Sequence, residues 1–279
     1  MKTYHFMAGL PRSGSTLLKS ILEQNPNIYA SPISPVMELM YWTEDYFKRS
    51  EQYKAYPKPK IAYNIINGIM DQFYSDVEKP IIIDHCRAWP NNIQRIKTYL
   101  TETPKIICPV RDILDILTSF IVMIHRNSNQ VSFIDQHLID NGIPVNDDTR
   151  CEHLMSDVGI VEQSLWAQYQ AFMKKDTRHM LFVEYEDLID HKEETMIKIY
   201  NFLEIDYYQH DFNNVVNGHR EMDIEVWNLK DMHYVRKEVK KTSKKPQDVL
   251  SHYILNKYKK LEYWKYPDSP YLKNGRFNK

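Results

Sequence analysis

This sequence of 279 residues contains few glycines and few cysteines and has almost no net charge. It contains seven glycines and three cysteines, and its formal net charge is −1. The cysteines are widely spaced, without a C-x-x-C pair or a histidine cluster at metal-ligand spacing, so we expect free thiols in a reducing compartment. The low net charge argues against a strongly basic nucleic-acid-binding surface. The three cysteines are Cys86, Cys108 and Cys151.

Long apolar runs are also missing. The longest candidate is an amphipathic stretch from Ile113 to Ile124, and Asp112 and Asp115 interrupt its start. No run approaches the length needed to span a bilayer. The first predicted strand begins at about Thr3, which leaves no room for a signal peptide. These patterns predict a soluble, cytoplasmic protein without a membrane partner.

The length and composition indicate one ordinary globular domain. Hydrophobic residues make up 43% of the chain, enough for a large core. A chain of this length is long for one domain and short for two, so we expect a single domain over residues 1–279 with an insertion.

Short apolar runs alternate with helical patterns along the chain. This alternation is typical of βαβ units and predicts an α/β fold with a central, mostly parallel sheet flanked by helices in three layers. The predicted helices include the segments 36–47 and 61–73, a segment through Ile93 and Leu100, and a last helix over about 246–259. The predicted strands are residues 4–8, 81–84, 105–110 and 181–185.

The first predicted strand leads into a glycine-bearing loop, Gly9-Leu10-Pro11-Arg12-Ser13-Gly14-Ser15-Thr16, and then into a helical pattern. The order of strand, glycine turn and helix directs backbone N–H groups and the positive end of the helix dipole towards an anion. The hydroxyls of Ser13, Ser15 and Thr16 are further candidate donors. A strand-to-helix turn that needs glycine only for its geometry is the alternative for this loop alone.

The loop has the glycine spacing of a nucleotide-binding P-loop but lacks the P-loop lysine. The pattern G-x-x-x-x-G-K-[ST] would require lysine at position 15, where this chain has Ser15, while Arg12 stands three residues earlier. The loop therefore suits phosphate without matching an ATP-hydrolysing enzyme.

A second candidate anion site follows the predicted strand that ends at Val110. Arg111 comes directly after this strand, and Ser119 lies eight residues on, about two helical turns away. Ligands of open α/β sheets bind at the carboxyl ends of strands, so both side chains could address one anion. A structural pairing of Arg111 with Asp112 or Asp115 is the alternative.

Two other segments could carry function. Residues 127–157 are rich in Asn, Asp and Ser and lack strong periodicity, so they are either a solvated loop or a lid on the acceptor side, with Ser156-Asp157 as a start signal for the next helix. Residues 227–246 are basic and are either a solvated face or a cover over a nucleotide.

Four of these segments together resemble the sulfotransferases that use 3′-phosphoadenosine 5′-phosphosulfate (PAPS). The resemblance is carried by Pro11 to Leu18, by Arg111 with Ser119, by the run Phe182 to Leu188 with its Tyr-Glu-Asp, and by the basic residues from Val235 to Pro246. The arginine in the first loop is similar to the tyrosylprotein and carbohydrate branches. The small-molecule branch has lysine there, followed by a tryptophan where this chain has Leu17.

The resemblance implies a P-loop-like fold and an enzyme that moves a sulfuryl group from PAPS to an acceptor hydroxyl. The product nucleotide would be 3′-phosphoadenosine 5′-phosphate (PAP), and no metal is required in this family. The first loop would hold the 5′-phosphosulfate, the Arg111–Ser119 pair the 3′-phosphate, and the basic segment would cover the nucleotide. The residues expected at the nucleotide are Pro11, Arg12, Ser13, Gly14, Ser15, Thr16, Leu17, Arg111, Ser119, Tyr185, Arg236, Lys237 and Lys245.

Three residues are candidates for the chemical step. Arg12 is permanently charged, and its guanidinium can donate two N–H groups to phosphate or sulfuryl oxygens, which suits a transition-state stabiliser. His85 follows the strand that ends at Asp84 and is the preferred base, because an ordinary imidazole titrates near pH ~6.5. Glu38 is the alternative base, since the tyrosylprotein branch carries a glutamate shortly after its loop helix. Arg87 could assist as a second cation.

Two other functions remain open at this stage. A P-loop kinase that uses ATP and Mg²⁺ would require Asp84 as a metal ligand. A non-catalytic phosphate-binding protein would bind PAP without sulfating any acceptor. These motifs do not identify the acceptor, which could be a carbohydrate, a tyrosine or a small alcohol. They do not indicate the oligomeric state either.

Overall fold

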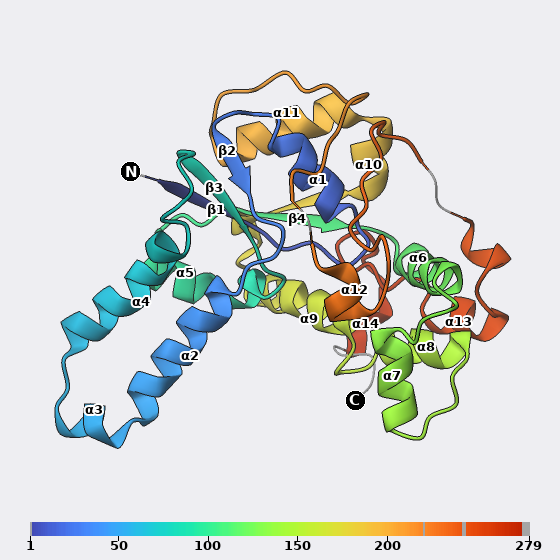
Figure 1. Ribbon diagram of the computed structural model, residues 1–279, viewed down its shortest axis with the longest axis horizontal. Coiled ribbons are helices and arrows are strands. Elements are labelled where there is room, and N and C mark those ends of the chain that lie inside the picture. Colours follow the sequence, from blue (N-terminus) through green and yellow to red (C-terminus); the bar gives the residue numbers. More distant parts are fainter. Residues whose placement is uncertain (1, 220, 242–243, 275–279) are drawn as a thin grey trace.

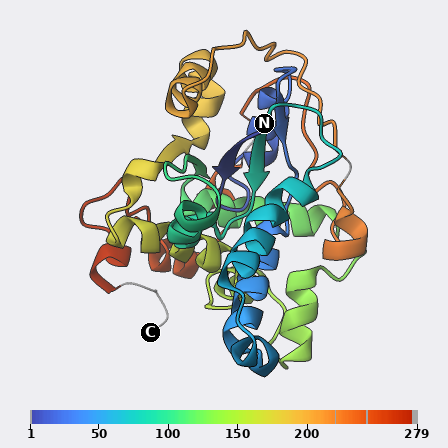
Figure 2. The same cartoon turned by 90° about the vertical axis from the view of Figure 1, so that its left-hand side faces the viewer.

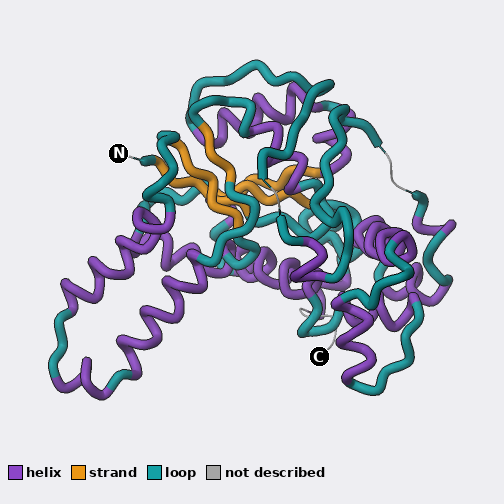
Figure 3. The backbone as a smooth tube through the Cα atoms, in the orientation of Figure 1, coloured by secondary structure: helices purple, strands orange, loops and turns teal. Residues whose placement is uncertain are grey.

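The computed structural model describes residues 2–219, 221–241 and 244–274, with side chains to residue 272. Its centre is a five-stranded sheet in the order β2-β3-β1-β4-β5, and all the strand pairs are parallel (Figures 1 and 3). The predicted α/β class with a parallel central sheet is confirmed. The strands are β1 (Thr3–Met7), β2 (Ile28–Ala30), β3 (Ile81–His85), β4 (Ile106–Val110) and β5 (Met180–Glu184).

Successive side chains along the strands face opposite layers. Met7 packs in a cluster with Leu18 and Ile21, whereas the preceding residue, Phe6, packs with Met70 and Trp89. Because helices cover both faces, the strands are apolar throughout, as is usual for a buried parallel sheet.

Helices form the two outer layers and the lower lobe of the molecule (Figure 2). One face of the sheet packs on α1, α10 and α11, and the other on α2, α4, η1 and α5. The helices are α1 (Ser15–Leu22), α2 (Val36–Arg49), α3 (Glu51–Ala55), α4 (Pro59–Phe73), η1 (Trp89–Asn92), α5 (Ile93–Tyr99), α6 (Ile113–Arg126), α7 (Phe133–Asp140), α8 (Asp147–Leu154), α9 (Ile160–Met173), η2 (Thr177–His179), α10 (Tyr185–Asp190), α11 (Lys192–Leu203), α12 (Asp223–Trp227), η3 (Pro246–Asp248), α13 (His252–Lys257) and α14 (Pro270–Asn274).

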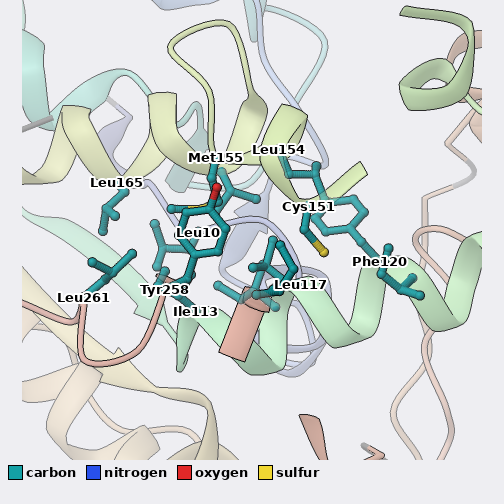
Figure 4. Close-up of a cluster of buried hydrophobic side chains, with 14 of the residues drawn as sticks. Leu10, Ile113, Leu117, Phe120, Cys151, Leu154, Met155, Leu165, Tyr258 and Leu261 are labelled. Atoms are coloured by element: carbon teal, nitrogen blue, oxygen red, sulfur yellow. The ribbon is translucent and has the colours of Figure 1, made fainter. Parts of the chain in front are cut away.

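The largest cluster of buried side chains joins α6 to the helices after it. Ile113, Leu117 and Phe120 of α6 meet Cys151 and Leu154 of α8, and Tyr258 and Leu261 close the cluster (Figure 4). Asp112 caps α6, because its carboxylate accepts hydrogen bonds from the N–H groups of Leu114 and Asp115, at 2.8 and 3.4 Å. This packing fixes the helix that carries Ser119.

The structure corrects several expectations. The short edge strand β2 was not predicted, and residues 127–157, expected to be irregular, contain α7 and α8. The next helix begins after Gly159 rather than at Ser156-Asp157. The predicted last helix is a 3-10 turn and a shorter helix, α13, separated at Ser251, whose hydroxyl accepts from the Ile254 N–H.

Helices α2 and α4 pack against each other as a hairpin that extends from the body, with α3 at its tip (Figures 1 and 2). No helix in the described part of the chain is both long enough and apolar enough to cross a membrane.

Candidate functional site: an anion-binding cavity at the carboxyl edge of the sheet

The sheet order places the glycine loop at a topological switch point. Strand β1 lies between β3 and β4, and the chain forms β2 and β3 on one side of β1 before it crosses to β4 and β5 on the other. Open parallel sheets bind ligands at such a point, beyond the carboxyl ends of the strands. The loop after β1, His85 at the end of β3 and Arg111 after β4 therefore share one edge.

Gly14 caps the first helix in a left-handed conformation, with φ at 87°. A Cβ atom at this position would lie 2.9 Å from Cδ2 of Tyr185, and one at Gly9 would lie 2.0 Å from Oγ of Ser15. Both glycines are thus required by the loop, one by its φ and both by close approach.

Ser13 does not serve the anion site with its hydroxyl, contrary to the expectation for that side chain. The hydroxyl lies 2.6 Å from the carbonyl oxygen of Leu10 and 2.9 Å from that of Pro109, and it donates to them. Ser13 is fully buried and ties the loop to strand β4. Its side chain is therefore structural.

The side chain of Arg111 bonds to the backbone of the loop that carries Arg12. The Arg12 Nε donates to the Ser119 hydroxyl at 3.2 Å, and its Nη1 donates to the carbonyl of Met232. The Arg111 guanidinium donates to the Arg12 carbonyl at 3.2 Å and lies over the Tyr185 ring, 4.2 Å from its centroid. Burial, with the neighbouring charge of Arg111, lowers the pKa of Arg12 to about 10, so Arg12 remains charged at neutral pH.

These groups line a cavity of about 570 Å³. Of the predicted residues, Pro11, Arg12, Gly14, Ser15, Thr16, Leu17, His85, Arg111, Ser119, Tyr185 and Arg236 line it. Ser13, Glu38, Lys237 and Lys245 are not among the lining residues. The lining holds eight basic side chains and three carboxylates, which are Arg12, Arg87, Arg111, Arg126, Lys230, Arg236, Lys240 and Lys244 against Asp115, Asp231 and Glu238. An anion is the ligand that such a lining favours.

His85 has one ring nitrogen fixed and the other without a partner. Its Nδ1 lies 2.6 Å from the carbonyl oxygen of Pro32, which can only accept, so Nδ1 carries the proton. Nε2 is buried, has no hydrogen-bond partner among the described residues, and belongs to a side chain that lines the cavity. Burial first, and then the charge of Arg87, lowers the pKa of His85 to about 4. The neutral imidazole therefore holds a bare lone pair at Nε2.

Glu38, the alternative base, and Asp84, the metal ligand of the kinase hypothesis, are not among the residues that line the cavity. Glu38 is exposed on the first turn of α2. Asp84 is fully buried and accepts hydrogen bonds from the Tyr74 hydroxyl at 2.6 Å and from Nε1 of Trp89 at 2.7 Å. Its oxygens are engaged in the core, so it does not fit the metal ligand that a kinase would require.

A charged network that was not predicted joins the loop helix to the segment over the cavity. Lys19 of α1 is buried and pairs with Glu221 at 3.0 Å. The imidazole Nδ1 of His233 lies 2.9 Å from Glu221 and 2.5 Å from Asp223. Lys19 stands at a core-like helical position, and Glu221 and Asp223 lie 200 residues away in sequence, so no local pattern indicates the contact.

The basic segment contributes other lysines than expected. Lys240 and Lys244 line the cavity, whereas Lys237 instead accepts a backbone hydrogen bond from the Val215 N–H at 2.7 Å. Thr242 and Ser243 lie outside the described residues. The basic composition was the available signal, but this stretch is irregular and has no period to show which lysines share a face.

A parallel sheet with an anion-binding loop at its switch point, beside a cavity rich in arginine and lysine, defines a P-loop-like protein that binds phosphate or sulfate groups. A family profile narrows this class. The sulfotransferase family matches residues 5–209, so the chain belongs to that family. It is a sulfotransferase, and the kinase alternative is not favoured.

A solved structure with a TM-score of 0.50 supports the same fold, and two further solved structures are similar to this chain at lower TM-scores. Retinol dehydratase, in a complex with retinol and PAP, shares 15% identity over 97% of this chain and 83% of its own, with a TM-score of 0.50. The sulfotransferase domain of the Synechococcus PCC 7002 olefin synthase shares 17% identity over 85% and 84%, with a TM-score of 0.48. The sulfotransferase from Alicyclobacillus acidocaldarius shares 16% over 80% and 88%, with a TM-score of 0.45. No curated protein matches the sequence.

Proposed function

We propose that this sulfotransferase takes the sulfuryl group from PAPS, passes it to an acceptor hydroxyl that is deprotonated by His85, and releases PAP. One observation carries the proposal: His85, whose Nε2 has no hydrogen-bond partner among the described residues, lines the same cavity as the anion-binding loop and the Arg111–Ser119 pair. Retinol dehydratase, which has this fold, was solved with PAP.

The cavity residues fit a nucleotide with anionic groups at both ends of its ribose. Backbone N–H groups at the start of α1 would hold the 5′-phosphosulfate, and the Arg12 guanidinium would join them by exchanging its bond to the Ser119 hydroxyl for a phosphosulfate oxygen. On the other side of β1, Arg111 and Ser119 would hold the 3′-phosphate. The Tyr185 ring packs against the Arg111 guanidinium. Arg236, Lys240 and Lys244 of the segment 227–246 supply further positive charge. PAPS supplies an activated sulfuryl group with a good leaving group.

In this proposal, His85 accepts the proton and Arg12 stabilises negative charge. The acceptor O–H proton moves to Nε2 of His85 as the acceptor oxygen bonds to sulfur and the bond from sulfur to the 5′-phosphate oxygen breaks, with PAP as the leaving group. The Nδ1–H bond to the Pro32 carbonyl stabilises the resulting imidazolium. Arg12 cannot give up a proton at neutral pH, so it acts as a fixed charge on the oxygens of the transferred group. Glu38 is exposed and outside the cavity, which makes it the weaker candidate base.

Calorimetry with PAP tests the nucleotide site. We expect PAP to bind and the variant Arg111→Ala to lose at least about tenfold in affinity, since charge-assisted hydrogen bonds contribute roughly 1.5–3 kcal/mol. The variant His85→Asn should keep PAP affinity and lose at least about 100-fold in turnover. Binding of ATP with Mg²⁺ but not of PAP would refute the proposal.

The remaining expectations belong with this proposal. Residues 1–279 act as one sulfotransferase domain, with residues 227–246 as the cover over the nucleotide. Of the segment 127–157, only Asn127 lines the cavity. If this segment contacts the acceptor, the contact is therefore made at its start, directly after α6. A cytoplasmic location and independence from metal remain predictions; sulfation in the presence of a chelator checks the second.

A further inference from the structure

Arg87 is a partly buried cation on the loop that carries the proposed base. It follows His85 by two residues and lines the same cavity. No hydrogen bond or ion pair to its guanidinium is found among residues 2–219, 221–241 and 244–274. Burial lowers its pKa, because surroundings of low polarity disfavour the charged form.

The nearest carboxylates are already engaged. Glu221 is close enough to influence Arg87, but it pairs with Lys19 at 3.0 Å and with His233 at 2.9 Å. Its pKa is lowered to about 2 by the hydrogen bond and charge of His233 and by Lys19, against the opposing effect of burial, so it is fully ionised and satisfied. Asp84 is bonded to Tyr74 and Trp89 in the core. Glu221 therefore acts on Arg87 only at longer range, and no carboxylate in the described part of the chain forms an ion pair with Arg87.

The position of Arg87 separates it from the groups proposed for the 3′-phosphate. Arg111 and Ser119 follow β4, on one side of β1, whereas Arg87 follows β3, on the other side. Two residues of chain span at most about 7 Å, so Arg87 starts next to the base. The acceptor hydroxyl must reach that same base.

We propose that Arg87 binds an anionic group of the acceptor, so that the preferred substrate is a hydroxyl compound that also carries a carboxylate or another anion near the sulfated oxygen. This inference rests on the proposed function and names its substrate class. The planar guanidinium forks two N–H groups onto a carboxylate, which would orient the hydroxyl towards Nε2 of His85.

Matched pairs of acceptors test the inference. Each pair shares its hydroxyl and differs in charge: glucuronic acid and glucose, 4-hydroxybenzoate and 4-hydroxybenzamide, and a tyrosine peptide flanked by glutamate or by glutamine. Sulfation rates are measured with PAPS, and acceptor binding to the PAP-saturated protein is measured by calorimetry. We expect kcat/KM about 10- to 100-fold higher for the acidic member of at least one pair.

The variants Arg87→Gln and Arg87→Lys locate the preference. The glutamine variant should raise KM for the acidic acceptor towards that of the neutral one, with PAP affinity unchanged, and lysine should restore part of the preference. Arg49→Gln, which removes an exposed cation of α2 outside the cavity lining, is the control and should keep the preference. Equal binding of both members of every pair, or no binding of any, overturns the inference, as does loss of kcat for both members in Arg87→Gln. Absence of PAP binding to the wild-type protein would instead overturn the proposed function.

Discussion

Gly14 holds the anion-binding loop in a backbone conformation that side chains rarely adopt. Its φ of 87° and the 2.9 Å approach of a Cβ atom to Tyr185 both oppose substitution. We expect Gly14→Ala to destabilise the fold by about 1–3 kcal/mol and to weaken PAP binding, as measured by urea unfolding and calorimetry.

Gly68 provides the control, because it lies inside α4 with nothing within 4 Å of a Cβ atom. Gly68→Ala should stabilise the protein by roughly 0.5–1 kcal/mol and leave PAP binding unchanged. A Gly14→Ala protein as stable as the wild type would contradict the strain argument.

The pKa of His85 sets the pH dependence of the proposed base. Burial lowers it from 6.5 to about 4, so the imidazole stays neutral from pH 8 down to about pH 5. We expect no fall in kcat/KM between pH 8 and 6 that depends on His85. A limb near pH 6.5 that is lost in His85→Asn would contradict this assignment.

The same shift affects stability. The unfolded chain binds a proton at His85 more tightly than the native one, so native stability is lost as pH falls below 6.5 towards 4.

At the scale of elements, the start of α6 rests on a buried carboxylate. Glu262 is 2% exposed, and its Oε1 accepts from the Ile113 N–H at 2.7 Å. Burial first, and then the charge of Asp112, raises the pKa of Glu262 from 4.5 to about 7. The native state thus binds this proton more tightly than the unfolded chain, and its stability contribution is lost as pH rises from 4.5 through 7.

We therefore expect Glu262→Gln to stabilise the protein at pH 8, by about 1–3 kcal/mol, and to have little effect at pH 5. Urea unfolding at the two pH values measures the difference. A variant that is less stable than the wild type at pH 8 would show that the ionised form is better satisfied than the burial of Glu262 indicates.

Elements with a strong local pattern were predictable, and those without one were not. The apolar runs of β1, β3, β4 and β5 indicate buried strands directly. Strand β2 has three residues, too few to show a period, and it exists because it pairs with β3. Helices α7 and α8 have polar, weakly periodic sequences, and they are stabilised by Ile134, Leu138 and Leu154 packing into the core that α6 begins.

At the scale of the whole molecule, the Lys19–Glu221–His233 network connects the loop helix to the segment over the cavity. Glu221→Gln would leave the buried Lys19 ammonium without its counter-charge. We expect a loss of about 3–5 kcal/mol in stability and faster hydrogen exchange over residues 230–240. Thermal unfolding and exchange mass spectrometry measure both.

The exposed pair of Lys54 and Glu51 in α3 is the matched control. Glu51→Gln should change neither stability nor exchange over residues 230–240, because exposed pairs contribute little. Unchanged exchange in Glu221→Gln would mean that the cover is held by other contacts, such as the Arg12 bond to the Met232 carbonyl.

The sequence by itself determined the α/β class, the anion-binding loop with Arg12, the positions of Arg111 and His85 at strand ends, and that of Ser119 on the helix after Arg111. These features follow from local patterns, because strand, turn and helix preferences act over a few residues. Only the tertiary structure decided that Ser13 is structural, that Asp84 is engaged in the core, and that Lys240 and Lys244 rather than Lys237 and Lys245 line the cavity. It also decided that, among the residues it describes, neither His85 Nε2 nor the Arg87 guanidinium has a hydrogen-bond partner. Each of these depends on partners brought together from distant parts of the chain, and burial and hydrogen bonding between such partners are set by packing rather than by local sequence.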